Sequence, residues 1–243
     1  MVILFLGILI TPVFSQDENI ALDKTSIRLF SEGNVYYSKM KFKEAIVSYD
    51  KAIKRNLNFY QAYTNRGLAK IGLAAFENTE LNLNSAINDF SKSIEINPKF
   101  EDAYFQRANA REVFDTTEAI KDYSKVIDLN PKAYDSYNNR GILKEGLSNY
   151  KEAINDYNKA IELNPRYAEA YNNRGSSNAK LTMHKEAIND YNKAIELNPR
   201  YAEAYNNRGF VKELLKIPYC EDFKVACDLG CSIGCYNIKL SCK

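Results

Sequence analysis

The phrase Tyr-Asn-Asn-Arg-Gly occurs three times in this chain of 243 residues, and the copies begin 34 residues apart, at Tyr137, Tyr171 and Tyr205. A second phrase, Asn-Pro, recurs at the same spacing and ends at Pro131, Pro165 and Pro199. Repetition at this period indicates a stack of small units that share one continuous core. Such a chain is expected to present a long curved surface to a partner.

Each unit carries apolar residues at helical spacing. Ala187, Tyr191 and Ala194 recur every three or four residues, which predicts an α-helix. A preceding helix carries a Tyr and then a Gly four residues later, as in Tyr171 and Gly175. The small Gly and Ala residues let the two helices approach closely. Asn-Pro ends the second helix, because the residue before Pro is pushed out of helical geometry.

These residues resemble the tetratricopeptide repeat (TPR) family, whose pattern sets aromatic residues, Leu-Gly, Ala and Pro at fixed intervals. The matching residues are Tyr171, Gly175, Ala187, Tyr191, Ala194 and Pro199, and Arg174 replaces the Leu. The resemblance covers residues 25–230. It implies an all-α fold, a right-handed TPR solenoid of five full helix-turn-helix repeats, a degenerate sixth and a C-terminal capping helix.

The repeat phase also predicts the segment boundaries. The expected segments are a signal peptide at 1–15, a linker at 16–25, TPR 1 at 26–59, TPR 2 with a loop insertion at 60–100, TPR 3 at 101–133, TPR 4 at 134–167, TPR 5 at 168–201, a degenerate TPR 6 at 202–230 and a Cys-rich capping helix at 231–243. The insertion is a polar, Asn-rich loop around residues 76–84. It is either a tolerated loop or a contact for a partner.

The N-terminus predicts export. Residues 2–10 are almost entirely apolar, but this run is shorter than the roughly 20 residues that span a bilayer. The residues around Ser15 suit a signal peptidase, so we expect a periplasmic or secreted protein after cleavage near Ser15. No Lys or Arg precedes the apolar run. A buried N-terminal helix is one alternative. A membrane-anchored adaptor or assembly factor of an envelope complex, retaining its apolar N-terminus, is another.

The charge balance argues against a nucleic-acid partner. The chain has 33 basic and 31 acidic residues and a formal net charge of +2. An electrostatic nucleic-acid binder shows a concentrated basic face instead. Hydrophobic residues make up 45% and charged residues 26%, as in an ordinary folded protein.

An Arg between packed helices requires a counter-charge. Units two to six carry Arg66, Arg107, Arg140, Arg174 and Arg208 together with Asp89, Asp122, Asp156, Asp190 and Asp222. The first unit has Glu32 and Ser48 in these two positions, so both members are missing together. This predicts a structural ion pair between the two helices of each later unit. The alternative is a row of Arg side chains that binds an acidic ligand.

The TPR resemblance implies that the first helix of each unit lines the concave side. The polar residues predicted to line this groove are Asn65, Gln106, Asn109, Asn138, Asn139, Asn172, Asn173, Asn206 and Asn207. Carboxamides can donate to and accept from the backbone of an extended peptide. Some TPR proteins hold polypeptides with such a row of Asn residues. The alternative is that these residues serve local packing of the helices.

Acidic residues begin the same helices, at Asp102, Asp135, Glu169 and Glu203. The TPR subclass that grips an acidic peptide C-terminus uses Lys and Asn in its groove, so that ligand is disfavoured here. An extended basic or polar segment of another protein complements this groove better.

The five Cys residues lie near the C-terminus, at Cys220, Cys227, Cys231, Cys235 and Cys242. A helical hairpin that turns at Cys231 would pair Cys227 with Cys235 and Cys220 with Cys242, and would leave Cys231 free. Other pairings and a zinc site are alternatives, although there is no Cys-x-x-Cys motif. Such bridges would cap the last unit, which has no neighbour. Exported TPR proteins of Gram-negative bacteria have similar Cys-rich closing helices.

The sequence shows no catalytic constellation. His184 is the only His, and no Gly-rich phosphate loop is present. We therefore predict a non-enzymatic protein-interaction scaffold without a cofactor, a metal, a small-molecule substrate or a membrane-spanning helix.

Overall fold

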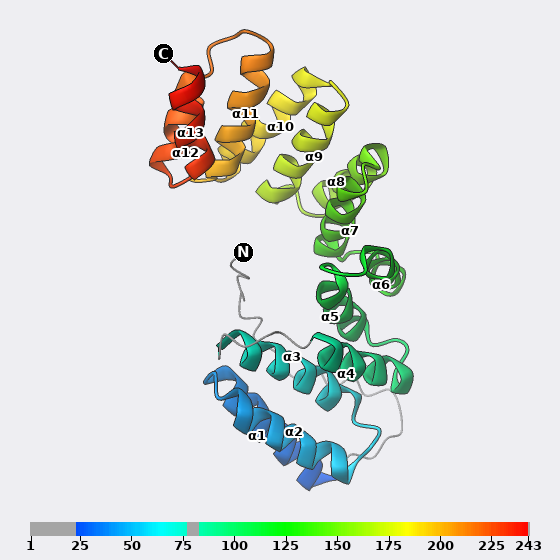
Figure 1. Cartoon of the computed structure of the whole chain (residues 1–243). Coiled ribbons are helices and arrows are strands. Elements are labelled where there is room, and N and C mark those ends of the chain that lie inside the picture. Colours follow the sequence, from blue (N-terminus) through cyan, green and yellow to red (C-terminus); the bar gives the residue numbers. More distant parts are fainter. Residues whose placement is uncertain (1–22, 77–82, 243) are drawn as a thin grey trace.

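The computed structural model describes residues 23–76 and 83–242, which form helices α1 to α13 and contain no strand. The helices pair in chain order along an open curve (Figure 1). The first helices of the units are α1 (Lys24–Ser38), α3 (Tyr60–Phe76), α5 (Glu101–Arg111), α7 (Tyr134–Gly146), α9 (Ala168–Lys180) and α11 (Ala202–Leu214). The second helices are α2 (Phe42–Arg55), α4 (Leu83–Ile96), α6 (Thr116–Leu129), α8 (Tyr150–Leu163), α10 (His184–Leu197) and α12 (Cys220–Asp228). The last helix is α13 (Ser232–Ser241).

The odd-numbered helices lie on the inner side of the curve. Helix α1 touches α3, α3 touches α5, α7 touches α9, and α9 touches α11. Helices on the inside of a curved stack are crowded together, whereas those on the outside are spread apart. Figure 1 shows the same arrangement for α5 and α7, which lie inside α6 and α8.

The helices of one unit pack through an aromatic ring seated on a Gly. A Cβ atom added at Gly141 would lie 2.6 Å from Cε1 of Tyr157, and one added at Gly175 would lie 2.7 Å from Cε1 of Tyr191. Both tyrosines are at most 2% exposed. The close approach therefore requires Gly at this position, because a side chain there would displace the ring.

Asn-Pro ends the second helices as the sequence predicts. The residue before Pro is Asn130, Asn164 or Asn198, and its φ is −134 or −135°. Each of these residues still donates its backbone N–H to the carbonyl of the last turn. The chain then turns directly into the next inner helix.

The all-α solenoid predicted from the repeats is confirmed. Helix α1 begins inside the predicted linker 16–25, because the carboxylate of Asp23 accepts from the backbone N–H groups of Thr25 and Ser26 and caps the helix. Both ends of the predicted loop 76–84 are helical, since α3 continues to Phe76 and α4 begins at Leu83. The predicted signal peptide and residues 77–82 of the loop lie outside the described residues.

Candidate functional site: the inner surface of the odd-numbered helices

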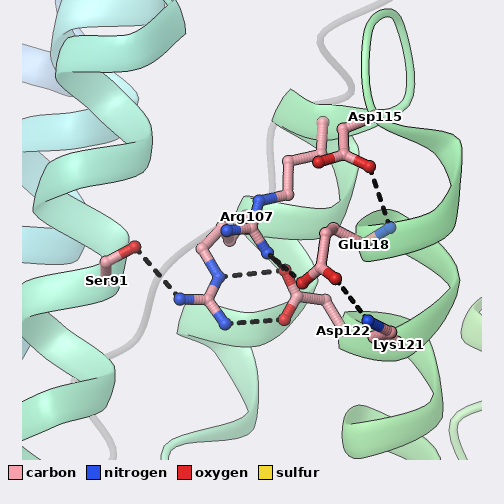
Figure 2. Close-up of polar contacts among 7 residues, drawn as sticks. Ser91, Arg107, Asp115, Glu118, Lys121 and Asp122 are labelled. Atoms are coloured by element: carbon pink, nitrogen blue, oxygen red, sulfur yellow. Dashed lines mark hydrogen bonds and ion pairs between the residues drawn. The ribbon is translucent and has the colours of Figure 1, made fainter.

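An Arg that contacts three helices fixes the position of each inner helix from α3 to α11. In the third unit, Arg107 of α5 donates through Nε and Nη2 to the two oxygens of Asp122 in α6, at 2.9 and 2.7 Å (Figure 2). Its Nη1 donates to Ser91 Oγ in the preceding helix α4, at 3.0 Å. A second cation, Arg111, reaches Asp122 at 2.7 Å. The guanidinium thus joins α5 to its own partner helix and to the unit before it.

The same clamp recurs in the other later units. The structure brings together the predicted pairs Arg66–Asp89, Arg140–Asp156, Arg174–Asp190 and Arg208–Asp222, with Nη2–Oδ1 distances of 2.5 or 2.6 Å. The contacts of the same Arg residues in the preceding unit are Asp50, Ser124, Asn158 and Asn192. The Asp side chains are at most 7% exposed. Paired and hydrogen-bonded in this way, the Arg side chains serve the scaffold and do not form a row free to bind an acidic ligand.

Three parts of the clamp were not predicted from the sequence. The carboxylate receives a second donor one helical turn after the Arg, from Lys70, Arg111, Lys144, Asn178 or Lys212. This spacing of four residues is visible in the sequence and could have predicted the second donor. The contact in the preceding unit leaves a weaker signal, because Asp, Ser and Asn all occupy that position. Each Arg also stacks on the Tyr three residues before it, with Cζ to ring-centroid distances of 5.2–5.7 Å.

The carboxamides form a hydrogen-bonded chain along the inner helices. From donor to acceptor it passes through Asn207, Asn172, Asn173, Asn138, Asn139 and Tyr123. The two steps that join one inner helix to the next, Asn207 to Asn172 and Asn173 to Asn138, are both 3.1 Å long, and the last step joins Asn139 to Tyr123 of the outer helix α6 at 3.3 Å. Adjacent inner helices are therefore joined by polar side chains as well as by apolar contacts.

Burial corrects part of the predicted groove. The exposed fractions of Asn65, Asn138, Asn172 and Asn206 are only 3–8%. Asn65 donates to Asn34 of α1 at 2.8 Å. These four side chains hydrogen-bond to Asn side chains of a neighbouring helix and are nearly closed to solvent, so they are not open to a peptide.

The other predicted carboxamides remain accessible. Asn109 is exposed, and Gln106, Asn139, Asn173 and Asn207 are half-buried. Gln106 donates to the carboxylate of Asp102 at 3.0 Å. Asn139, Asn173 and Asn207 each use one amide N–H in the chain of hydrogen bonds, and the second N–H of each can donate to a ligand.

Carboxylates and tyrosines alternate along the start of the inner helices. Glu169 and Glu203 are exposed and Asp135 is half-buried. Burial, together with the charges of Glu169 and Asp135, raises the pKa of Tyr167. Burial, together with the charges of Glu203 and Glu169, raises the pKa of Tyr201 in the same way. Each of these two tyrosines is therefore close enough to two successive carboxylates for both to affect its pKa.

The first carboxylate of the row differs from the others. Asp102 is partly covered, and burial raises its pKa while the hydrogen bond from Gln106 opposes the change. Further along α7, Glu145 accepts from Ser176 Oγ at 2.7 Å and from Ser177 Oγ at 2.9 Å, both in α9. Glu145 thus connects two units, whereas Glu169 and Glu203 are exposed and Asp135 is half-buried.

Comparison with known proteins agrees with the repeat pattern. The family model described as TPR repeat matches residues 146–181 and 184–215. The solved TPR protein of Parabacteroides merdae superimposes with a TM-score of 0.67 at 18% identity, covering 91% of this chain and all of that one. This chain is a TPR solenoid. MamA superimposes with a TM-score of 0.63 at 23% identity, covering 74% of this chain and 94% of that one.

A third solved TPR protein is YrrB, described as having an unusual peptide-binding site. It superimposes with a TM-score of 0.62 at 23% identity and covers 79% of this TPR solenoid and 97% of its own chain. Curated relatives match over shorter stretches. Hsp70-Hsp90 organizing protein 3 of Arabidopsis thaliana is 34% identical over 76 residues, and human mitochondrial import receptor subunit TOM70 is 33% identical over 90 residues. These matches cover 31% and 35% of the chain but only 12% and 14% of the two relatives.

The TPR solenoid ends in two disulfides. Cys220 is bonded to Cys242 and Cys227 to Cys235, and Cys231 is free, which is the predicted arrangement. The bonds join α12 to α13 and to the residue that follows α13. No group of His, Cys, Asp or Glu side chains suited to a metal ion occurs within residues 23–76 and 83–242. Over the same ranges, no helix is long and apolar enough to cross a bilayer.

Proposed function

We propose that this TPR solenoid is a non-enzymatic scaffold that binds an extended basic or polar segment of another protein along its inner surface. The observation that carries the proposal is the row of carboxylates at Asp135, Glu169 and Glu203, one in each of the fourth, fifth and sixth units, of which Glu169 and Glu203 are exposed and Asp135 is half-buried. A cationic segment lying across successive units would meet one carboxylate per unit. Complementary charge of this kind favours the correct partner and speeds its association.

The accessible carboxamides add a contact that does not depend on side-chain sequence. Asn139, Asn173 and Asn207 each use one amide N–H within the scaffold. The remaining N–H can donate to a backbone carbonyl of an extended segment. The likeness to YrrB, a TPR protein described by its peptide-binding site, favours a peptide as the ligand.

Selection from a displayed library of random 12-residue peptides tests the proposal and does not require the partner itself. We expect the selected peptides to be rich in Lys and Arg and to lose binding at least tenfold to the Glu169→Lys, Glu203→Lys variant. The matched control is Glu162→Lys, Glu196→Lys, which makes the same charge change at exposed positions of the outer helices α8 and α10.

Either of two results would reject the proposal. One is that selection yields no peptides, or yields peptides rich in Asp and Glu. The other is that the inner and outer charge variants lose affinity equally, which would mean that the peptides respond only to the overall charge of the protein.

The proposal also places the protein in an oxidising compartment after export. The two disulfides support this, because such bonds persist outside the reducing cytosol. Mass spectrometry of the protein purified from its native compartment should find a mature chain beginning at Gln16. A chain that keeps its apolar N-terminus and sediments with membranes would instead support the anchored adaptor.

A further inference from the structure

The last helix presents an apolar stripe to solvent. Ile233, Tyr236 and Leu240 of α13 are 58, 61 and 59% exposed. Their spacing of three and four residues puts them on one side of the helix. The end unit of a solenoid usually has a polar outer face that keeps it soluble. The stripe therefore calls for an explanation beyond capping.

The contacts of α13 show which position it takes in the stack. Gly234 is buried, and a Cβ atom added to it would lie 2.8 Å from Cβ of Ala226 in α12. Asn237, three residues later, donates to Asn206 of α11 at 3.0 Å. The preceding inner helices have the same buried small residue followed three positions later by Asn, in the pairs Ala170 and Asn173, and Ala204 and Asn207. Helix α13 therefore occupies the place of one more inner helix.

This register places Ile233 and Leu240 on the inner surface and Tyr236 at the position of Asn206, on the edge that a further inner helix would cover. Ile233 precedes the small residue just as Glu169 and Glu203 do in α9 and α11. Leu240 corresponds to Phe210 of α11, which is itself 50% exposed. Where the middle units present carboxylates, the last unit presents apolar side chains.

The chemistry of the neighbouring positions identifies the occupant. Glu203 and Glu213 lie on α11, the helix next to the stripe. A two-fold contact between copies of this chain would bring like carboxylates toward each other around the stripe, which opposes a dimer. A basic segment with an apolar end meets no such repulsion, because its cationic part faces the carboxylates while its end covers the stripe.

We propose that Ile233, Tyr236 and Leu240 form an apolar anchor site at the C-terminal end of the inner surface. The ligand is the segment of the proposed function, on which this inference rests, with one or two large apolar residues at the end that reaches α13. The anchor fixes the direction and register of the segment, which the repeated carboxylates alone leave ambiguous.

Peptides selected from the random library test the anchor separately from the acidic row. We expect most of them to combine Lys and Arg with Leu, Ile, Phe or Tyr at one end. By fluorescence anisotropy, Ile233→Ser, Leu240→Ser should weaken binding of such a peptide about tenfold, as expected for losing the burial of one large apolar side chain. The matched control is Val47→Ser, an exposed apolar residue of the outer helix α2. A peptide with its apolar end changed to Ala should bind the wild type and the double variant equally.

The outcomes separate the two proposals. Basic peptides without an apolar end, or full affinity for the Ile233→Ser, Leu240→Ser variant, would overturn the anchor and leave the scaffold function intact. A lack of basic peptides would overturn both. Sedimentation showing a dimer that Ile233→Ser abolishes would assign the stripe to a second copy of the chain and also overturn the anchor. Circular dichroism of each variant verifies that it is folded.

Discussion

The first unit and the later units hold their two helices together in different ways. Between α1 and α2 the contact is aromatic. The ring centroid of Phe30 in α1 lies 5.8 Å from that of Tyr49 in α2 and 4.8 Å from that of Phe59, the residue before α3. In the fourth unit the ion pair between Arg140 and Asp156 also joins the two helices. The difference shows that the clamp is not needed to form a helix pair. Its value lies in fixing one geometry in successive units, so that their inner surfaces match.

The largest expected effect is that of breaking one clamp. Asp156→Ala leaves Arg140 and Lys144 without their carboxylate in a half-buried site, and should cost about 3–5 kcal/mol of unfolding free energy. Ser48→Ala, at the equivalent position of the first unit, should cost less than about 1 kcal/mol. Urea unfolding followed by circular dichroism measures both.

A double variant sharpens this test. Arg140→Leu combined with Asp156→Ala leaves only Lys144 without its carboxylate and should recover part of the stability lost in Asp156→Ala alone. Equal losses for Asp156→Ala and Ser48→Ala would contradict the distinction between the two regions.

The next effect concerns the end that the disulfides close. Replacing Cys220 and Cys242 with Ser removes a bond that spans 22 residues, and should destabilise the C-terminal hairpin by about 3 kcal/mol. Hydrogen exchange should show faster opening of α12 and α13, with α1 and α2 unchanged, because units of a solenoid contact only their neighbours. Uniformly faster exchange along the chain would contradict this local role.

A third test addresses what the two regions share. Gly33→Ala and Gly141→Ala both push a methyl group into a Tyr ring and should each cost about 1–3 kcal/mol. The control is Gly146→Ala, where no atom lies within 4 Å of the added Cβ and helix propensity favours Ala. Thermal unfolding ranks the three variants. A loss of stability in Gly141→Ala alone would show that the packing of the Tyr ring against Gly differs between the first and fourth units.

The smallest effect is expected in the carboxamide chain. Asn207→Ala removes one hydrogen bond to Asn172, and should cost about 1 kcal/mol. Asn158→Ala, which removes a contact of Arg174 on the exposed side, should cost less. Differential scanning calorimetry can compare the two. A larger loss for Asn158→Ala would mean that the contacts of Arg174, and not the chain of carboxamides, stabilise this region.

The sequence predicted the features that repeat and missed those that depend on exposure. The period of 34 residues, with Gly and Ala at fixed positions, was enough for the helix pairs. The joint replacement of Arg and Asp by Glu32 and Ser48 at the two equivalent positions of the first unit was enough to predict the ion pairs. The sequence could not show that Asn138 is buried and Asn139 accessible, because the burial of adjacent residues on one helix depends on how the next helix packs against them. The inner position of α13 was also hidden, because Gly234 and Asn237 match the repeat only through their contacts.

The central claim is that the inner surface of the odd-numbered helices receives the partner segment. Photo-cross-linking tests it directly, with p-benzoylphenylalanine placed at position 169 on inner helix α9 or at position 162 on outer helix α8. We predict that a selected basic peptide cross-links at position 169 and not at position 162, and that excess unlabelled peptide removes the product. Cross-linking at position 162 alone, or equal cross-linking at both positions, would contradict the claim.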